Sequence, residues 1–268
     1  MNKNNLIKVE KDGHIARFIL NRPEKLNSID EEGYEQIKQL FIDIDKDPDI
    51  RAIIVKGEGK CFTAGMDLAA LGSLVRDGAA DSREFLRKDI LNGQQGMSVI
   101  EKCTKPVIAA VHNYCLGAGV DLLSACDIRI ASRDAVFSVR EVRMGVIADL
   151  GTLQRLPYII GHGWFRELAL TGRDFSAEEA LQMGFITRIC NSKEAVFEEA
   201  EKLADELASC PPLAVQGTKD VLLYSRDNGV EAGLKYVAQK NATALISEDI
   251  TEAVTAAMEK RKPVFKGK

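Results

Sequence analysis

The sequence predicts an α/β fold that ends in an all-helical region. In residues 7–56, strand-like runs and a helix follow each other in the order strand, turn, strand, helix, strand, which is typical of layered α/β packing. After Pro211-Pro212, three helical segments follow at about 212–225, 229–247 and 249–261, with no strand between them. The change in pattern places a boundary near 195–210. We therefore divide the chain into an α/β core, residues 1–200, and a C-terminal helical region, residues 201–268.

The first part of the core carries clear local signals. Residues 7–20 alternate around Asp12-Gly13, which predicts a β-hairpin. Ser28 and Glu31 have the spacing of a capping box and predict a helix that runs to about residue 45. Apolar residues recur on one face of that helix. Residues 50–56 (IRAIIVK) read as a buried strand, and the turn at 57–59 closes it.

The remaining elements of the core follow from the same patterns. We expect helices at 85–102, 120–125, 165–171, 177–183 and 192–209, and strands at 106–112 and 135–139. Gly172 and Gly184 are expected to end the two helices that precede them. Helical pattern alone does not decide what the C-terminal region packs against. We expect it to pack on a neighbouring subunit, and packing on its own core is the alternative.

Composition and charge exclude several classes of protein. Lys plus Arg is 36 and Asp plus Glu is 40, and a net charge of −4 argues against a general nucleic-acid binder. The sequence contains no run of 18 apolar residues, so no membrane-spanning helix is expected. The three histidines have no metal-ligand spacing, so no metal site is expected. The first 18 residues lack a signal-peptide apolar segment and the last four, FKGK, are not a peroxisomal signal, which together predict a cytoplasmic location.

The stretch 115–154 holds the residues best suited to chemistry. The turn Gly117-Ala118-Gly119 opens a helix, and its free N–H groups suit an oxygen that becomes anionic during a reaction. Asp121, Glu141 and Asp149 lie among apolar residues after this turn. Each of these acids could instead be structural, since an acid in a first helical turn is often only a partner of the helix dipole. Three acids beside an N–H-rich turn favour catalysis more than any one of them.

Four segments resemble the crotonase, or enoyl-CoA hydratase/isomerase, superfamily. They are CFTAGMDL (61–68), KPVIAAVHNYCLGAGVDLLSACDIRIAS (105–132), REVRMGV (140–146) and GTLQRLPYIIG (151–161). The resemblance runs from about residue 19 to the C-terminus. It implies a crotonase-like spiral of ββα units, with the C-terminal helical region serving oligomerisation as a homotrimer or homohexamer.

Within this superfamily, the three acids and residues 218–241 most resemble the Δ3,5-Δ2,4-dienoyl-CoA isomerases. Hydratases usually carry Glu in place of Asp121 and Gly in place of Asp149. The resemblance implies isomerisation of a 3,5-dienoyl-CoA to a 2,4-dienoyl-CoA in fatty-acid β-oxidation. Glu141 would act on the C2 proton and Asp149 on the C6 proton, while Asp121 would orient or tune them. The backbone N–H groups of Met66 and Ala118 would form the oxyanion hole.

The resemblance also implies where the substrate binds. An acyl-CoA thioester is the expected partner, and no separate cofactor is expected because coenzyme A is part of the substrate. The implied coenzyme A contacts are Lys25, Leu26, Ala64, Gly65, Met66, Asp67, Leu68, Gly117, Lys262 and Phe265. Two alternatives stay open. One is hydration of a 2-enoyl-CoA by Asp121 and Glu141, and the minor one is RNA binding, for which the cluster at 260–262 is the densest basic run.

Overall fold

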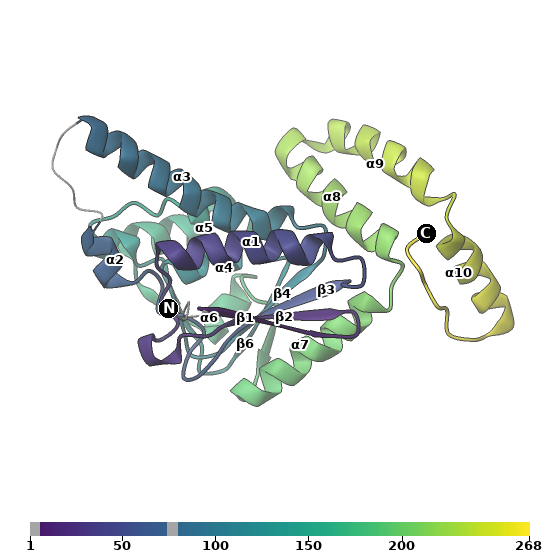
Figure 1. Ribbon diagram of the computed structural model, residues 1–268, viewed down its shortest axis with the longest axis horizontal. Coiled ribbons are helices and arrows are strands. Elements are labelled where there is room, and N and C mark those ends of the chain that lie inside the picture. The colour runs from purple at the N-terminus through teal and green to yellow at the C-terminus, as the bar shows by residue number, and fades with distance from the viewer. Residues whose placement is uncertain (1–5, 74–79) are drawn as a thin grey trace, which may run out of the picture.

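The computed structural model describes residues 6–73 and 80–268, which build two β-sheets and the helices around them (Figure 1). The larger sheet has the strand order β1-β2-β3-β4-β6-β9, and the smaller one has the order β5-β7-β8. The strands of the larger sheet are β1 (Ile7–Asp12), β2 (Ile15–Leu20), β3 (Ala52–Gly57), β4 (Val107–Val111), β6 (Ile128–Ser132) and β9 (Arg188–Cys190). Those of the smaller sheet are β5 (Tyr114–Leu116), β7 (Val136–Ser138) and β8 (Asp174–Ser176). The β1–β2 hairpin and the β7–β8 pair are antiparallel, and the other pairs are parallel.

Helices cover both faces of the larger sheet. In chain order, all the described helices are η1 (Pro23–Lys25), α1 (Glu31–Lys46), α2 (Leu68–Ser73), α3 (Ala80–Lys102), α4 (Ala118–Ala125), η2 (Glu141–Met144), α5 (Thr152–Thr171), α6 (Ala177–Gln182), α7 (Lys193–Ala208), α8 (Pro212–Asn228), α9 (Val230–Ala244) and α10 (Glu248–Glu259). Figure 1 shows α1, α3, α4 and α5 on one side of this sheet and α7 on the other. Successive strand residues face opposite sides, so Ile53 and Val55 join one hydrophobic cluster while Ala52 and Ile54 join the other with α7. Apolar residues on both faces are typical of a parallel sheet that is covered on both sides.

The chain spirals between the two sheets, which confirms the expected α/β fold. It runs from β4 in the larger sheet to β5 in the smaller one and then into α4. It repeats this path from β6 to β7, and then enters η2 and α5. These are ββα units. Each turn of the spiral therefore delivers a helix or loop to the same region beside the smaller sheet.

Several boundaries differ from the expected ones for clear physical reasons. Asp30, not Ser28, caps α1, because its Oδ1 accepts the Gly33 N–H at 3.0 Å. Helix α5 begins at Thr152 rather than at 165, and it contains Pro157 and a kink at Gly161, where φ is 73° and ψ is 162°. Proline and glycine usually mark the end of a helix in a sequence. In α5, however, the residues on both sides of Pro157 and Gly161 remain helical. Strands β5, β8 and β9 have three residues each, too few to give a periodic signal.

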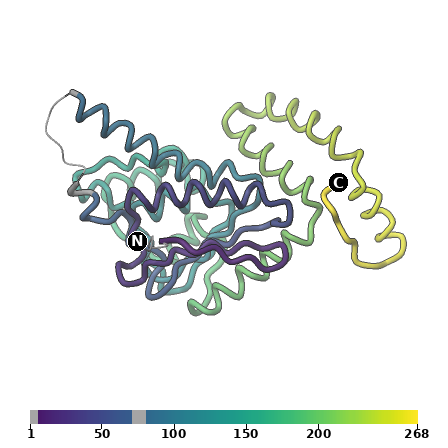
Figure 2. The backbone as a smooth tube through the Cα atoms, viewed as in Figure 1, coloured from purple at the N-terminus to yellow at the C-terminus, as the bar shows by residue number. Residues whose placement is uncertain are grey.

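The C-terminal helices leave the core after α7. Figure 2 shows the backbone turning away through α8, α9 and α10, with the C-terminus lying back beside the arm they form. Helix α7, which holds residues 201–208 of the expected C-terminal region, packs on the larger sheet. The projecting arm is therefore formed by α8, α9 and α10. Within the described ranges, no helix is both long and apolar enough to cross a membrane.

Candidate active site

A short extended segment, residues 63–67, runs beside the start of α1. Met66 forms an isolated parallel bridge with Ile29. The Ile29 N–H donates to the Gly65 carbonyl at 2.8 Å, and the Asp67 N–H donates to the Ile29 carbonyl at 2.8 Å. Neighbouring peptide groups of an extended strand point in opposite directions, so the Met66 N–H faces away from Ile29. It has no acceptor in the part of the chain that the structure describes.

Gly65 brings this segment against the turn that opens α4. A Cβ atom at Gly65 would lie 2.5 Å from the Leu116 carbonyl oxygen and 3.5 Å from the Ala118 nitrogen, and the φ of Gly65 is +93°. Only glycine fits such an approach. Ala118 is the first residue of α4, where N–H groups lack an intrahelical acceptor, and within residues 6–73 and 80–268 its N–H has none. The fold therefore places the two expected oxyanion donors, Met66 and Ala118, on adjoining backbone segments.

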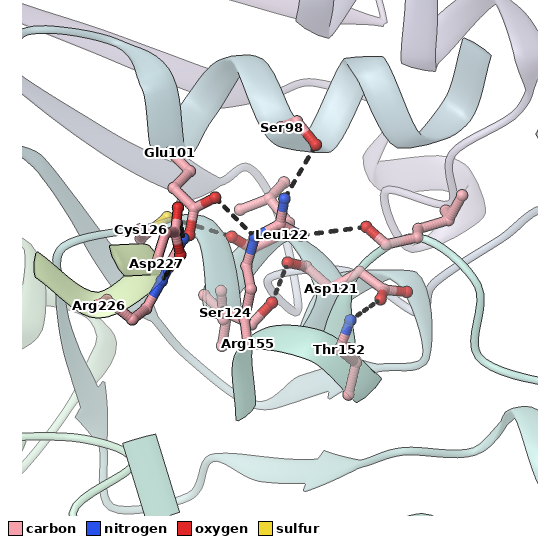
Figure 3. Close-up of polar contacts among 12 residues, drawn as sticks. Ser98, Glu101, Asp121, Leu122, Ser124, Cys126, Thr152, Arg155, Arg226 and Asp227 are labelled. Carbon is pink, nitrogen blue, oxygen red and sulfur yellow. Dashed lines mark hydrogen bonds and ion pairs between the residues drawn. The ribbon is translucent and has the colours of Figure 1, made fainter. Parts of the chain in front are cut away.

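Asp121 lies one turn into α4 and is almost fully buried, with 1% of its surface exposed. Its Oδ1 accepts the Thr152 N–H at 2.7 Å, which links α4 to the start of α5 (Figure 3). Burial raises the pKa of Asp121 to about 6, although hydrogen bonding by Thr152 lowers it and the nearby Asp149 raises it. The backbone thus holds this carboxyl in place, and its pKa lies nearer to neutral pH than that of an ordinary aspartate.

Glu141 begins η2, at the end of the smaller sheet. Its Oε1 lies 3.4 Å from the position that a Cβ atom would take on Gly117, so the carboxyl adjoins the oxyanion turn. Its Oε2 is buried without a hydrogen-bond partner among the described residues. Burial, then the charges of Asp121 and Asp149, raise the pKa of Glu141 to about 7. A carboxyl with such a pKa can take up and release a proton near neutral pH.

Asp149 lies in the loop between η2 and α5 and is half-buried. Its backbone carbonyl accepts the side-chain amide of Gln94, on α3, at 2.8 Å. Burial raises the pKa of Asp149, and Asp149 is near enough for its charge to raise the pKa of both Asp121 and Glu141. The structure thus brings together all three acids that the sequence singled out.

Arg155 anchors the loop that carries Asp149, and sequence reasoning missed this role. The Arg155 Nη1 donates to the Leu150 carbonyl at 3.3 Å and its Nη2 donates to the Ser98 hydroxyl at 2.9 Å. Its Nε forms an ion pair with Glu101 at 3.2 Å, and Figure 3 shows Arg226 of α8 on the same carboxylate. A buried arginine inside a helical pattern gives no sequence signal of its own. Its segment was noted only for its resemblance to the superfamily.

A cavity of about 470 Å³ adjoins Asp149 between α3, α5 and α8. Gln94, Ser98, Gln154 and Tyr158 are among the residues that line it. The cavity therefore provides open space next to Asp149, outside the acid cluster.

Most of the expected coenzyme A contacts also lie together. The Leu26 carbonyl accepts the Ala64 N–H at 2.9 Å, which joins the end of η1 to the oxyanion segment. The Lys25 Nζ lies 3.6 Å from the Asp67 Oδ2, and about half of the Lys25 side chain is exposed. Leu68, which begins α2, is 66% exposed. These residues lie with Met66 and Gly117 around the oxyanion turn, over the buried Gly65.

Lys262 and Phe265 are not part of that group within one chain. The Phe265 carbonyl accepts the Arg51 guanidinium at 2.8 Å, just before β3 begins. The register pairs Ile15 with Ala52 and Leu20 with Gly57, so Arg51 lies at one end of the larger sheet and Lys25, after Leu20, at the other. Any contact of these two residues with coenzyme A would need another subunit. Among the described residues, no cluster of His, Cys, Asp and Glu could hold a metal ion.

Curated proteins resemble this chain over nearly all of its length. It is 44% identical over 265 residues to a protein of Arabidopsis thaliana named peroxisomal Delta(3,5)-Delta(2,4)-dienoyl-CoA isomerase, covering 97% of this chain and 95% of that protein. It is 46% identical over 253 residues to a mitochondrial protein of the same name from Mus musculus, covering 92% of this chain and 77% of that one. A carnitinyl-CoA dehydratase of Salmonella typhi is 35% identical, covering 96% of this chain and 97% of that protein.

These names overturn the expected location. The isomerases that resemble this chain at 41–46% identity are named peroxisomal or mitochondrial, which contradicts the cytoplasmic location predicted from the chain ends. Targeting signals are short terminal segments that the catalytic fold does not require, so the terminal residues were a weak basis for that prediction.

The fold and the family agree with these relatives. The structure matches a crystal structure of an enoyl-CoA hydratase from Bacillus anthracis with a TM-score of 0.91 and 30% identity, covering 98% of this chain and all of that one. The model of the enoyl-CoA hydratase/isomerase family matches residues 10–268. With the oxyanion turn and the carboxyl cluster in place, these matches show that the chain belongs to the enoyl-CoA hydratase/isomerase family.

Proposed function

We propose that this protein isomerises 3,5-dienoyl-CoA to 2,4-dienoyl-CoA in the β-oxidation of unsaturated fatty acids. The observation that carries the proposal is the third carboxyl, Asp149, which lies in the same cluster as Asp121 and Glu141. Relatives that share 41–46% of their residues with this chain are named for this activity, so the hydratase alternative is less favoured. Adding water across one double bond has no evident need for a third acid.

The reaction begins at the thioester end. The Met66 and Ala118 N–H groups, which lack acceptors within the described residues, bind the thioester oxygen. Glu141 takes a proton from C2, and the electron pair of that bond moves into the conjugated chain while negative charge builds on the oxygen. Two preorganised donors stabilise that charge, and losing one such donor typically costs about 2.7–4 kcal/mol.

The reaction ends at the far side of the diene. The C3–C4 and C5–C6 double bonds shift to C2–C3 and C4–C5, and C6 takes a proton from Asp149. Glu141 is then protonated and Asp149 is ionised, so the balance of protons and electrons is closed within the site. No electrons leave the substrate, and the step therefore needs no redox cofactor. Asp121, held by the Thr152 N–H, orients the pair.

The arm supports a second part of the proposal, assembly as a homotrimer or homohexamer. Large apolar side chains on α8, α9 and α10 are exposed in the single chain. They include Leu222 (66%), Leu234 (64%) and Met258 (80%). Exposed apolar surface of this kind is typical of protein interfaces. A neighbouring subunit packed on this arm would also give Lys262 and Phe265 a route to coenzyme A.

A panel of 2-enoyl-, 3-enoyl- and 3,5-dienoyl-CoA thioesters tests the activity. Conversion of the 3,5-dienoyl substrate extends the conjugation to the thioester carbonyl, so the absorbance moves to longer wavelength while the mass stays constant. Hydration adds the mass of one water. Efficient hydration of the 2-enoyl substrate without any dienoyl turnover would refute the isomerase proposal and support the hydratase.

A further inference from the structure

Tyr34 has a buried hydroxyl group that the reaction described above does not use. Its side chain, in the first turn of α1, is 4% exposed. Its Oη has no hydrogen-bond partner among the described residues. A buried hydroxyl without a partner typically costs about 1–3 kcal/mol, so phenylalanine would suit stability better at this position. The hydroxyl therefore calls for a functional explanation.

Packing places Tyr34 beside the site. Helix α1 starts just after Ile29, which pairs with Met66 of the oxyanion segment. Helix α3 approaches the Tyr34 backbone so closely that a Cβ atom at Gly96 would lie 2.9 Å from the Tyr34 carbonyl oxygen and 3.5 Å from the Tyr34 Cβ. Two residues earlier on α3, the Gln94 side chain donates to the Asp149 carbonyl at 2.8 Å. Tyr34 thus lies between the segment with an oxyanion donor and the helix that supports the far carboxyl.

The carboxyl cluster acts on this phenol electrostatically. Burial, followed by the charges of Asp121, Asp149 and Glu141, raises the pKa of Tyr34 far above its ordinary value. Asp30, the smallest of these influences, is itself paired with Arg22 at 3.2 Å. The phenol therefore keeps its proton throughout the working pH range and is available as a hydrogen-bond donor.

We propose that Tyr34 is a positioning residue of this site, whose hydroxyl donates a hydrogen bond to the ionised carboxylate of the cluster when substrate is bound. The inference rests on the proposed isomerisation. In that reaction the negative charge starts on Glu141 and ends on Asp149. A hydroxyl that never titrates can follow the charge by rotating its O–H bond, whereas a fixed backbone donor such as the Thr152 N–H serves Asp121 alone.

Tyr34→Phe tests the role because it removes only the hydroxyl. We expect kcat to fall about tenfold to a hundredfold and KM to stay within about twofold, since a hydrogen bond to a charged group is lost and the coenzyme A contacts are untouched. The acidic limb of the pH profile of kcat, which reports the pKa of the base in the substrate complex, should move up by about one pH unit, because the ionised base loses a donor. The melting temperature should stay equal or rise.

Tyr236→Phe is the matched control. It removes a phenol that donates to the Asp220 carboxylate at 2.7 Å in the arm, outside the acid cluster. Its pH profile should match that of the wild type. If Tyr34→Phe fails to fold, 3-fluorotyrosine at position 34 replaces it. The fluorinated phenol is a stronger donor, so it should move the acidic limb down.

The outcomes separate this inference from the proposed function. Wild-type dienoyl turnover, with kcat and pH profile unchanged in Tyr34→Phe, would overturn the role of Tyr34 and leave the isomerase intact. Wild-type hydration without dienoyl turnover would overturn the isomerase. In that case the pH profile of hydration, compared between Tyr34→Phe and the wild type, would decide the role of Tyr34. An unchanged acidic limb would overturn that role. A protein that turns over neither substrate overturns both.

Discussion

The Glu141 carboxyl should make the stability of this protein depend on pH, and Glu141→Gln should remove that dependence. Burial and the neighbouring acids raise its pKa from the ordinary 4.5 to about 7 in the folded state. A carboxyl with a raised pKa favours the protonated form in the fold. Its contribution to stability is therefore complete below pH 4.5 and is lost as the pH rises through 7. At about 1.36 kcal/mol per pKa unit, the full loss is about 3 kcal/mol.

Urea unfolding at pH 5 and pH 8 measures this effect, at one protein concentration because assembly also changes apparent stability. Relative to the wild type, Glu141→Gln should be more stable by about 1 kcal/mol at pH 5 and by about 3 kcal/mol at pH 8. Glu206→Gln, which alters an exposed carboxylate on α7, should have the same small effect at both pH values. An equal stability change for Glu141→Gln at the two pH values would refute the buried, uncompensated carboxyl described here.

Three further predictions concern catalysis and assembly. Asp149→Asn should lower the initial rate of dienoyl isomerisation by about 10²-fold or more, because it removes the proton for C6, and coenzyme A affinity should change little. A wild-type rate would contradict the role of Asp149. Ala118→Pro removes an oxyanion donor and should lower kcat by about 10²–10³-fold, whereas Met66→Leu, which keeps its backbone N–H, should be mild. A folded Ala118→Pro variant with normal kcat contradicts the oxyanion assignment. Light scattering should show a trimer or hexamer at micromolar concentration, and a fully active monomer would end that proposal.

Periodicity and turn chemistry were enough to predict the main elements. The alternation around Asp12-Gly13 predicted the β1–β2 hairpin, and the helical pattern of 192–209 predicted α7. The cap of α1 was placed at Ser28 because its spacing to Glu31 fits a capping box. Asp30 is also a good cap, and the bridge from Ile29 to Met66 fixes the chain so that Asp30 takes that position. Long-range pairing of this kind leaves no local sequence signal.

The same limit explains which site residues could be predicted. Asp121, Glu141 and Asp149 were recognisable because charges are unusual among apolar neighbours, and the motifs gave them roles. Tyr34 fits the apolar stripe of α1, so its pattern predicted burial alone. Arg155 likewise gave no hint that it anchors the Asp149 loop, because that depends on Ser98 and the Leu150 carbonyl meeting its guanidinium in space.

The three carboxyls differ in how they are held, and this difference suits them to a proton shift. Asp121 is fixed by the Thr152 N–H, Glu141 has an unpartnered buried oxygen, and Asp149 is only half-buried. Like charges in one buried cluster cannot all ionise, so the cluster retains a proton near neutral pH. Because Asp121 is already compensated by a backbone donor, the retained proton is free to reside on Glu141 or Asp149. An acid and a base are then present at the two ends of the diene at once, and the reverse reaction uses the same two groups with their roles exchanged.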